Sequence, residues 1–188
     1  AILIGNGTGG FGAATGFAVG TNPQDVAIGL FNADANLDIA VTNNTSNNIT
    51  VLLGLGTGSF GPATNYSVGT GAQGIVIADF NTDGINDLAV TNNGSNNVSL
   101  LMGTGTGSFG AATNFATGNG PRGIAIADFN NDNKKDIVVA NFANATITAY
   151  LGNGAGGLGP INTFTVGSAP NAVAIADFDG VVGVDAVT

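Results

Sequence analysis

Residues 79–90 read DFNTDGINDLAV, and near-copies of this stretch recur along the chain at one fixed interval. DFNNDNKKDIVV starts at Asp128, DFDGVVGVDAV starts at Asp177, and LFNADANLDIAV starts at Leu30. Neighbouring copies are therefore 49 residues apart. A fixed period of this length indicates a repeat architecture, in which one supersecondary unit is used several times.

One unit, residues 72–120, contains four short runs of the kind that form β-strands, and the fourth is more polar than the others: GIVIADF, LAVTN, VSLLMG and AATNFATG. Turn-forming segments rich in Gly, Asn and Ser separate the runs, and no stretch shows helical periodicity over ten or more residues. Four-stranded antiparallel units at this period predict an all-β chain that folds as a β-propeller. A β-helix is the rival architecture, but it requires a much shorter repeat.

The repeat also predicts how the domain is organised. Residues 1–188 form one propeller domain whose units are 23–71, 72–120, 121–169, and 170–188 completed by 1–22. One blade is therefore split between the termini, and pairing its two halves would close a ring and hide both sheet edges. Two alternatives stay open at this point. The chain is a fragment of a larger ring, or it completes its ring as a homo-oligomer.

The composition excludes several classes of function. The net charge is −9, with three basic residues, so the chain lacks the basic face that nucleic-acid binding needs. No apolar run reaches the length of a membrane span, so we expect no membrane insertion. The chain has no His, Cys or Glu. Because its aspartates follow a metal-like spacing, we expect that it is not an enzyme.

The acidic loop places oxygen-bearing side chains at positions one, three, five and nine: Asp79, Asn81, Asp83 and Asp87. Gly84 at position six permits a tight turn, and Ile85 at position seven offers its carbonyl oxygen. Hard oxygen ligands gathered around one point are the coordination that calcium prefers. The alternative is a metal-free turn built by Asn and Asp side chains. We favour calcium because carboxylates held close together repel one another unless a cation lies between them.

The other copies match this pattern to different degrees. The loop from Asp128 keeps the full set, with Asn133 in place of the glycine, and its ligands are Asp128, Asn130, Asp132, Lys134 (carbonyl) and Asp136. The last loop keeps Asp177, Asp179 and Asp185 but has Val181 at position five, so its occupancy stays open. The loop at 30–38 begins with Leu30 and has Ala35 at position six, and we expect it to be weak or empty.

The acidic loop followed by DLAVTN, and the later GTGSFG followed by PAT or AAT, resemble the FG-GAP and VCBS repeats. The resemblance covers essentially the whole chain. It implies a propeller of the integrin-α or propeller-lectin kind, with calcium held by the loop between the first and second strands of a blade. That family usually forms seven blades, whereas this chain has four repeats.

The resemblance and the composition together suggest a calcium-binding β-propeller that acts as an adhesion module, secreted or on a cell surface and bacterial in type. By resemblance to the propeller lectins, carbohydrate is the expected ligand. The alternative is a structural or protein–protein interaction scaffold, such as an adhesin or filament component, without sugar binding. The aromatic residues Phe17, Tyr66, Phe115 and Phe164 recur at the 49-residue period. We expect them to pack between blades, although a sugar could stack on them.

Overall fold

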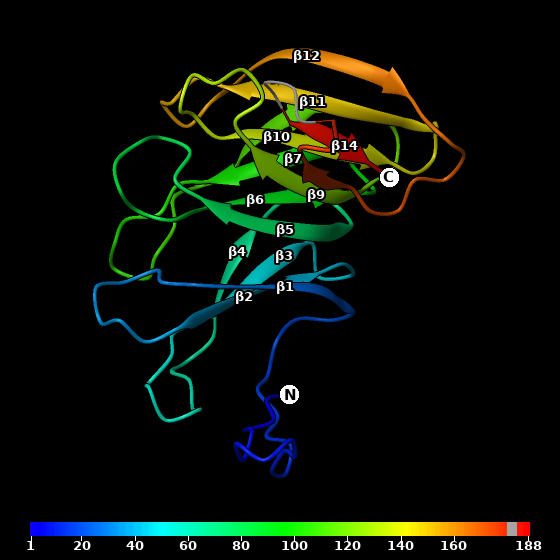
Figure 1. Ribbon diagram of the computed structural model, residues 1–188. Helices are drawn as coiled ribbons and strands as arrows, with labels where there is room; N and C mark the ends of the chain where they lie inside the picture. The colour runs from blue at the N-terminus through cyan, green and yellow to red at the C-terminus, as the bar shows by residue number, and fades with distance from the viewer. Residues whose placement is uncertain (180–183) are drawn as a thin grey trace.

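The computed structural model describes residues 1–179 and 184–188, and their regular structure consists of antiparallel β-sheets (Figure 1). Blade one comprises β1 (Pro23–Gly29), β2 (Asp38–Asn43), β3 (Asn48–Leu52) and β4 (Thr64–Ser67). Blade two comprises β5 (Ala72–Ala78), β6 (Asp87–Asn92), β7 (Asn97–Leu101) and β8 (Thr113–Ala116). Blade three comprises β9 (Pro121–Ala127), β10 (Asp136–Asn141), β11 (Thr146–Gly152) and β12 (Leu158–Thr165). A two-stranded sheet, β13 (Ala174–Ala176) and β14 (Asp185–Val187), follows.

The strands pair in the order in which the chain makes them, as in a propeller blade. In blade two, Ile77 pairs with Leu88 and Leu88 pairs with Leu101, so one row of apolar side chains crosses the sheet. Every residue of β6 and of β10 is buried, because both faces of these strands are covered by neighbouring sheets. The predicted all-β propeller with four-stranded blades and a 49-residue repeat is therefore confirmed.

The core consists of two layers, each between one blade and the next. Between blades one and two it contains Phe31, Ala40, Ile49 and Val51 on one side and Ile75, Leu88, Val90 and Leu101 on the other. The layer between blades two and three repeats the pattern, with Phe80, Ala89, Val98 and Leu100 facing Ile137, Val139 and Tyr150. Burial of these side chains, at about 1.5–3 kcal/mol each, is what holds neighbouring blades together.

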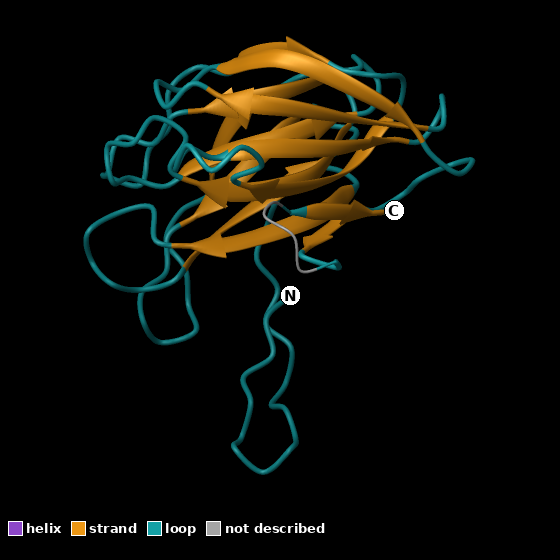
Figure 2. Cartoon of the chain, turned by 45° about the horizontal axis from the view of Figure 1, so that its top comes forward, coloured by secondary structure: helices purple, strands orange, loops and turns teal. Residues whose placement is uncertain are grey.

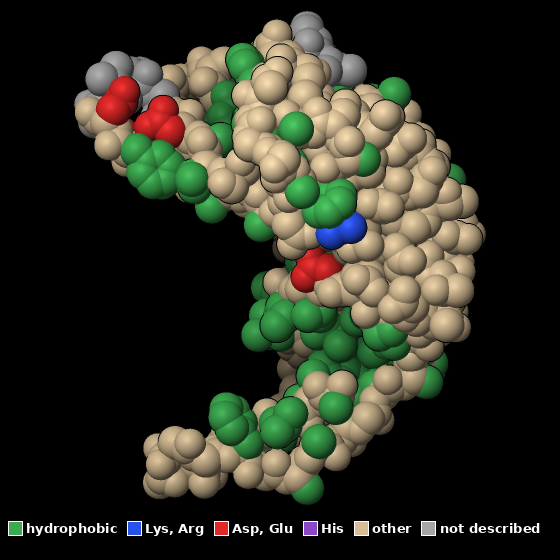
Figure 3. Space-filling model, turned by 90° about the vertical axis from the view of Figure 1, so that its right-hand side faces the viewer, with side chains coloured by type: hydrophobic (Ala, Val, Ile, Leu, Met, Phe, Trp, Pro, Cys, Tyr) green, Lys and Arg blue, Asp and Glu red, His purple; other side chains and the backbone are tan. Residues whose placement is uncertain are grey.

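The blades are arranged as an open arc. The innermost strands β1, β5 and β9 lie next to one another, and β13 lies next to β9. The space-filling view shows a C-shaped molecule whose hollow side is open (Figure 3). The hairpin of residues 1–22, with bridges from Ile2 to Thr15 and from Gly5 to Phe11, extends from the blade-one end (Figures 1 and 2). The described chain is thus a partial propeller, and the assignment of 170–188 and 1–22 to one blade stays a prediction.

Among the described residues, no helix is long and apolar enough to cross a membrane.

A buried amide at the end of each second strand shows how the repeats differ. Asn92 donates to Asn97 and to Ser99, at 2.8 Å each, but its buried Oδ1 has no hydrogen-bond partner among the described residues. In blade three the equivalent Asn141 has such a partner, because the Thr117 hydroxyl donates to its Oδ1 at 3.0 Å. Val68, which follows β4, occupies the same repeat position as Thr117, which follows β8.

This difference leads to two opposite predictions about stability, one for each repeat. We expect Val68→Thr to stabilise the protein by about 1 kcal/mol, because the hydroxyl can satisfy the orphaned oxygen of Asn92. We expect Thr117→Val to destabilise it by about 1–2 kcal/mol, because it creates the same orphan at Asn141. Urea unfolding of the two variants measures both effects. Equal shifts of the same sign would contradict the interpretation.

Candidate functional site

The acidic loops lie between the first and second strands of each blade, where the resemblance placed them, and they leave corresponding edges of successive blades (Figure 1). The loop of residues 79–86 joins β5 to β6, and the loop of residues 128–135 joins β9 to β10. Because the strands before and after each loop are fixed in the core, the loop ends are held in place. The repeat therefore presents comparable acidic loops along one edge of the arc.

The aspartate at position nine joins two parts of the blade. Asp87 is fully buried, and its two carboxylate oxygens accept hydrogen bonds from the backbone amides of Phe80 and Gly103, both at 2.8 Å. Asp38 and Asp136 make the same pair of contacts in blades one and three. In the last repeat, Asp185 accepts from the amide of Phe178. This residue therefore has a structural role that the sequence pattern did not reveal.

The remaining carboxylates of the second loop point back into it. Asp79 accepts from the amides of Asp83 at 3.2 Å and Gly84 at 2.8 Å. Asn81 accepts from the amide of Asp83, and Asp83 accepts from the amide of Ile85. These bonds are the ones that a metal-free turn built by Asn and Asp side chains would make. Calcium binding by this loop stays a prediction.

The third loop has the same arrangement with one addition. Asp128 accepts from the amides of Asp132 and Asn133, and Asp132 accepts from the amide of Lys134. The Lys134 ammonium group also lies 3.2 Å from Asp132 Oδ2, and both side chains are partly exposed. Lys134 therefore supplies a positive charge beside an oxygen that we assigned to calcium. The second loop has Ile85 at that position.

Backbone angles agree with the expected tight turn at position six. Gly84 has φ +81° and Asn133 has φ +62°, a conformation that Gly and Asn tolerate. Ala35 occupies the same place in the first loop with φ +61°, where its Cβ causes strain.

We therefore expect Ala35→Gly to raise the free energy of unfolding by about 0.5–1 kcal/mol, because it removes this strain. Ala33→Gly, in the same loop but at ordinary φ, is the matched control and should lower stability slightly. Thermal unfolding of both variants separates the two effects. A loss of stability with Ala35→Gly would contradict the prediction.

Burial and neighbouring negative charges raise the pKa values of the position-nine carboxyl groups Asp87 and Asp136. Burial raises the pKa of Asp87 above its usual value, while the amides of Gly103 and Phe80 lower it and the charges of Asp83 and Asp79 raise it further. Burial likewise raises the pKa of Asp136, with the same opposing contributions from its own loop. At position five, the hydrogen bond from the Lys134 amide is the main cause that lowers the pKa of Asp132. A cation bound in either loop would offset the repulsion at position nine.

The last loop brings its three carboxylates together. Oxygen atoms of Asp177, Asp179 and Asp185 lie within 4.8 Å of one another, the one such group of three acidic residues in the described part of the chain. The second and third loops also contain three aspartates each, at positions one, five and nine, but the structure does not gather either set into such a group. Val181, which left this loop in doubt, lies outside the described residues. Occupancy of all four loops stays a prediction.

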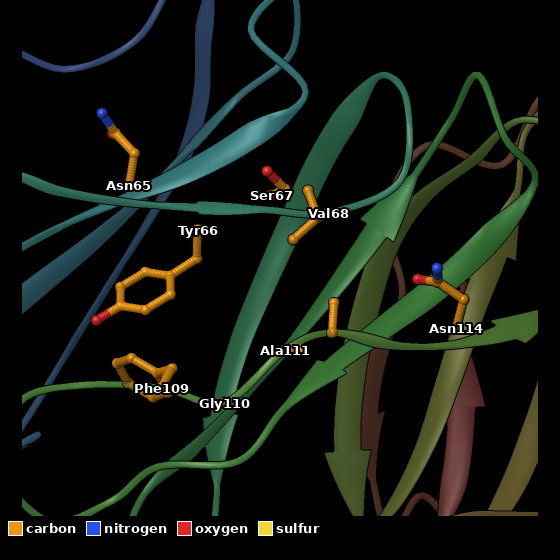
Figure 4. Close-up of a pocket in the computed structure, with 9 residues that line it drawn as sticks. Asn65, Tyr66, Ser67, Val68, Phe109, Gly110, Ala111 and Asn114 are labelled. Carbon is orange, nitrogen blue, oxygen red and sulfur yellow. The ribbon is translucent and has the colours of Figure 1, made fainter.

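A second candidate site is a groove between the outer parts of blades one and two, with a volume of about 490 Å³ (Figure 4). Tyr66 lines it and packs edge-on against Phe109, with ring centroids 5.6 Å apart, which agrees with the expected packing role. Asn65 on β4 and Asn114 on β8 add polar groups to the same groove. Their side-chain oxygens accept from Thr50 at 2.7 Å and Ser99 at 2.6 Å, so both amides are held in fixed orientations.

The sequence singled out Tyr66, because an aromatic residue recurs at this position every 49 residues. It gave no indication that Tyr66 lines a groove. The two asparagines belong to different repeats and line one groove only because adjacent blades pack side by side.

Comparison with solved structures supports the fold. A lectin of Agrocybe aegerita, described as specifically recognising non-reducing terminal N-acetylglucosamine, aligns with a TM-score of 0.58 and 20% identity over 87% of this chain and 45% of the lectin chain. BBS1N, solved in complex with ARL6DN, aligns with a TM-score of 0.56 and 11% identity over 86% of this chain and 48% of the BBS1N chain. The chain thus spans less than half the length of these two structures.

Among curated proteins, none matches the chain. The family model described as an FG-GAP-like repeat matches it three times, at residues 31–90, 79–139 and 128–180. These matches begin close to the start of each acidic loop and together cover most of the sequence. The chain therefore belongs to the family of FG-GAP-like repeat proteins.

Proposed function

We propose that this protein is a calcium-stabilised carbohydrate-binding module that is secreted or displayed on a bacterial cell surface. The observation that carries the proposal is the groove that is lined by Tyr66 and by the fixed amides of Asn65 and Asn114 (Figure 4). Sugars present hydroxyl groups for amides and apolar ring faces for aromatic side chains, and a few polar groups beside an aromatic surface are typical of ligand sites. The proposal includes no catalytic step.

The repeat supports multivalent binding. Asn114 on β8 follows Asn65 on β4 by one repeat, and Phe115 follows Tyr66. Weak contacts at several blades would gain avidity on a surface that carries many copies of one glycan. The structural similarity to the Agrocybe aegerita lectin shows that this fold can serve sugar recognition, although its low identity does not extend to the site.

In this proposal calcium has a structural role and binds the oxygen-rich loops. The two sets with the full pattern are Asp79, Asn81, Asp83, Ile85 and Asp87, and Asp128, Asn130, Asp132, Lys134 and Asp136. Extracellular calcium modules bind at about 10⁻⁴–10⁻³ M, which suits a protein outside the cell. The bound ion would fix the loops that connect the inner two strands of each blade.

A glycan array, run once in millimolar calcium and once in chelator, tests the proposal. We expect discrete binding to glycans. Asn65→Asp and Asn114→Asp should weaken it about tenfold, because each keeps the acceptor oxygen and loses the NH₂ donor. Asn6→Asp is the matched control, because Asn6 also accepts through its oxygen but lies in the N-terminal hairpin. An unchanged array with both groove variants would contradict this location for the site.

The same experiment separates the roles of the two sites. Binding that survives chelation would mean that calcium does not organise the groove. A blank array from folded protein would contradict carbohydrate binding and favour the protein-interaction alternative. BBS1N, a propeller of similar fold, was solved with a protein partner, which gives that alternative its support.

A further inference from the structure

A polar hollow lies at the ends of the first strands that are opposite to the acidic loops. It has a volume of about 250 Å³ and is lined by the second and third residues of β1, β5 and β9, together with Asn171 and Ala172 just before β13. The acidic loops leave the other ends of these strands. None of the residues that line the hollow lines the groove of Asn65 and Asn114. The hollow is therefore distinct from both candidate sites described above.

Close packing of the first strands brings the residues of the hollow together. A Cβ added at Gly74 would lie 2.6 Å from the carbonyl oxygen of Arg122, and one added at Gly123 would lie 2.7 Å from the Cα of Ala172. Glycine at these two positions therefore lets the next repeat approach closely. The carbonyl oxygen of Arg122 also accepts a hydrogen bond from the Thr91 hydroxyl of blade two at 2.6 Å, which fixes the backbone at this point.

Arg122 gives the hollow a positive charge. It is the one arginine of the chain, and the other repeats have neutral amides at the equivalent position: Gln24, Gln73 and Asn171. The same repeat departs from the pattern a second time, because Phe142 replaces the asparagines at positions 44 and 93. The two departures are in contact, since Cζ of Arg122 lies 3.6 Å from the centroid of the Phe142 ring. The aromatic face therefore holds the guanidinium group in place.

The guanidinium group of Arg122 is only partly paired. One terminal nitrogen, Nη1, donates to Oδ1 of Asn171 at 2.9 Å. Nε is buried and has no hydrogen-bond partner among the described residues. A buried N–H of a charged group that lacks an acceptor destabilises the protein. A carboxylate can accept two parallel hydrogen bonds from a guanidinium group, so it is the ligand group that Arg122 best accommodates.

Asp25 gives the same hollow a negative charge. It is the one acidic residue outside the acidic loops, and it occupies the repeat position of Gly74 and Gly123. Its two oxygens accept from the backbone amides of Val26 at 2.9 Å and Ile75 at 3.1 Å, so the carboxylate has a fixed orientation. Each oxygen can accept a further hydrogen bond. Figure 3 shows a basic and an acidic group close together on the inner side of the arc.

The two charges of the hollow do not neutralise each other. Arg122 and Asp25 line one hollow, but they form no ion pair with each other in the described part of the chain. A simple anion would meet the charge of Asp25 and the net charge of −9, both of which repel it. A molecule that carries both a carboxylate and an ammonium group has no net charge and can contact both residues.

We propose that this hollow binds a small zwitterion of the amino-acid type, with its carboxylate on Arg122 and its ammonium group on Asp25. Gln73, on the strand between β1 and β9, supplies a neutral amide along the same hollow. This site adds a small-molecule ligand to the functions proposed above, and it requires neither calcium nor a sugar.

Titration followed by ¹⁵N NMR tests the proposal, because a chain with one arginine gives one Nε–H signal. The probes are amino acids whose amino and carboxylate groups lie at opposite ends of the molecule, from glycine to 6-aminohexanoate. The controls are the carboxylate and the amine of the same length, each with only one of the two charges. We expect the Arg122 signal to shift and then saturate. The best amino acid should bind about fivefold more tightly than the matching carboxylate, because only the amino acid contacts Asp25.

Two variants test the assigned contacts by calorimetry. Arg122→Gln should weaken binding of the best amino acid at least about tenfold, because the carboxylate loses its charged partner. It introduces the residue that the first two repeats have at this position, so we expect an unchanged melting temperature. Asp25→Asn should weaken binding about fivefold and make the amino acid no better than the carboxylate. Lys135→Gln removes the same charge from an exposed residue outside the hollow and should bind like the unsubstituted chain.

The titration is run once in millimolar calcium and once in chelator, and we expect the same affinity in both. Binding that requires calcium would place the carboxylate on an ion in an acidic loop and would overturn the proposal. Equal binding of the amino acid and the carboxylate would contradict the role of Asp25. If no probe moved the Arg122 signal, the guanidinium group would only pack against Phe142 and the site would not exist.

Discussion

Replacement of Asp87 by alanine is expected to lower the free energy of unfolding by about 2–4 kcal/mol, because two buried amides lose their acceptor. The carboxylate accepts from Phe80, at the start of the acidic loop, and from Gly103, just after β7. Its removal therefore disconnects the loop from the end of the third strand. Burial raises the pKa of Asp87, so relief of that cost offsets part of the loss. Urea unfolding at neutral pH measures the effect.

Two variants in the same loop serve as controls. Asp87→Asn keeps one acceptor oxygen and should cost less than Asp87→Ala. Asp83→Ala removes an exposed carboxylate and should change stability without calcium by less than about 0.5 kcal/mol. If Asp87→Ala and Asp83→Ala proved equally mild, the structural role assigned to position nine would be wrong.

Removal of calcium is expected to have the second large effect. Calcium at ten- to a hundredfold above its dissociation constant should stabilise the protein by about 1.4–2.7 kcal/mol per occupied site. Thermal unfolding in millimolar calcium and in chelator measures the difference. Asp83→Asn should reduce it, because a carboxylate ligand is lost from the second loop. An identical melting temperature in both conditions would favour the metal-free turn interpretation.

The calcium effect should also depend on pH. The pKa of Asp87 and that of Asp136 are raised above 3.8 in the folded protein without calcium, chiefly by burial. Protonation of these carboxyls therefore favours that folded state, whose stability falls as pH rises through the raised values. Calcium binds the ionised form, so its stabilisation is complete above the raised pKa and is lost as pH falls through it. The difference in melting temperature should shrink before pH reaches 3.8, and a difference independent of pH would contradict this.

The third loop offers a comparison within the same protein. Lys134 places an ammonium group against Asp132, whereas Ile85 leaves Asp83 without one. Lys134→Ile should therefore strengthen calcium binding at the third loop, because the ion no longer competes with a fixed positive charge. Isothermal titration calorimetry of this variant, with Lys135→Ile as the control, measures the change. Weaker binding by Lys134→Ile than by Lys135→Ile would contradict the prediction.

Local sequence determined the fold and the composition of the loops. The 49-residue period and the alternation of small and branched residues specify four-stranded blades, whose second strands β6 and β10 bury both faces between neighbouring sheets. Position six of the acidic loops could also be predicted. Gly84 and Asn133 adopt the left-handed backbone that the tight turn requires, and this preference is local to each residue.

Only the tertiary structure decided what these residues contact. The amide of Gly103 donates to Asp87, and Asn65 and Asn114 line one groove; each case brings together residues from different strands or blades, which no local pattern encodes. Which apolar positions are exposed at the ends of the arc is likewise decided only by the tertiary structure. The sequence supplies equivalent apolar positions in every repeat, so Val26 and Ile75 look alike in it. Their exposures differ because a blade is covered only where another blade follows in space, and that position depends on the packing of the whole chain.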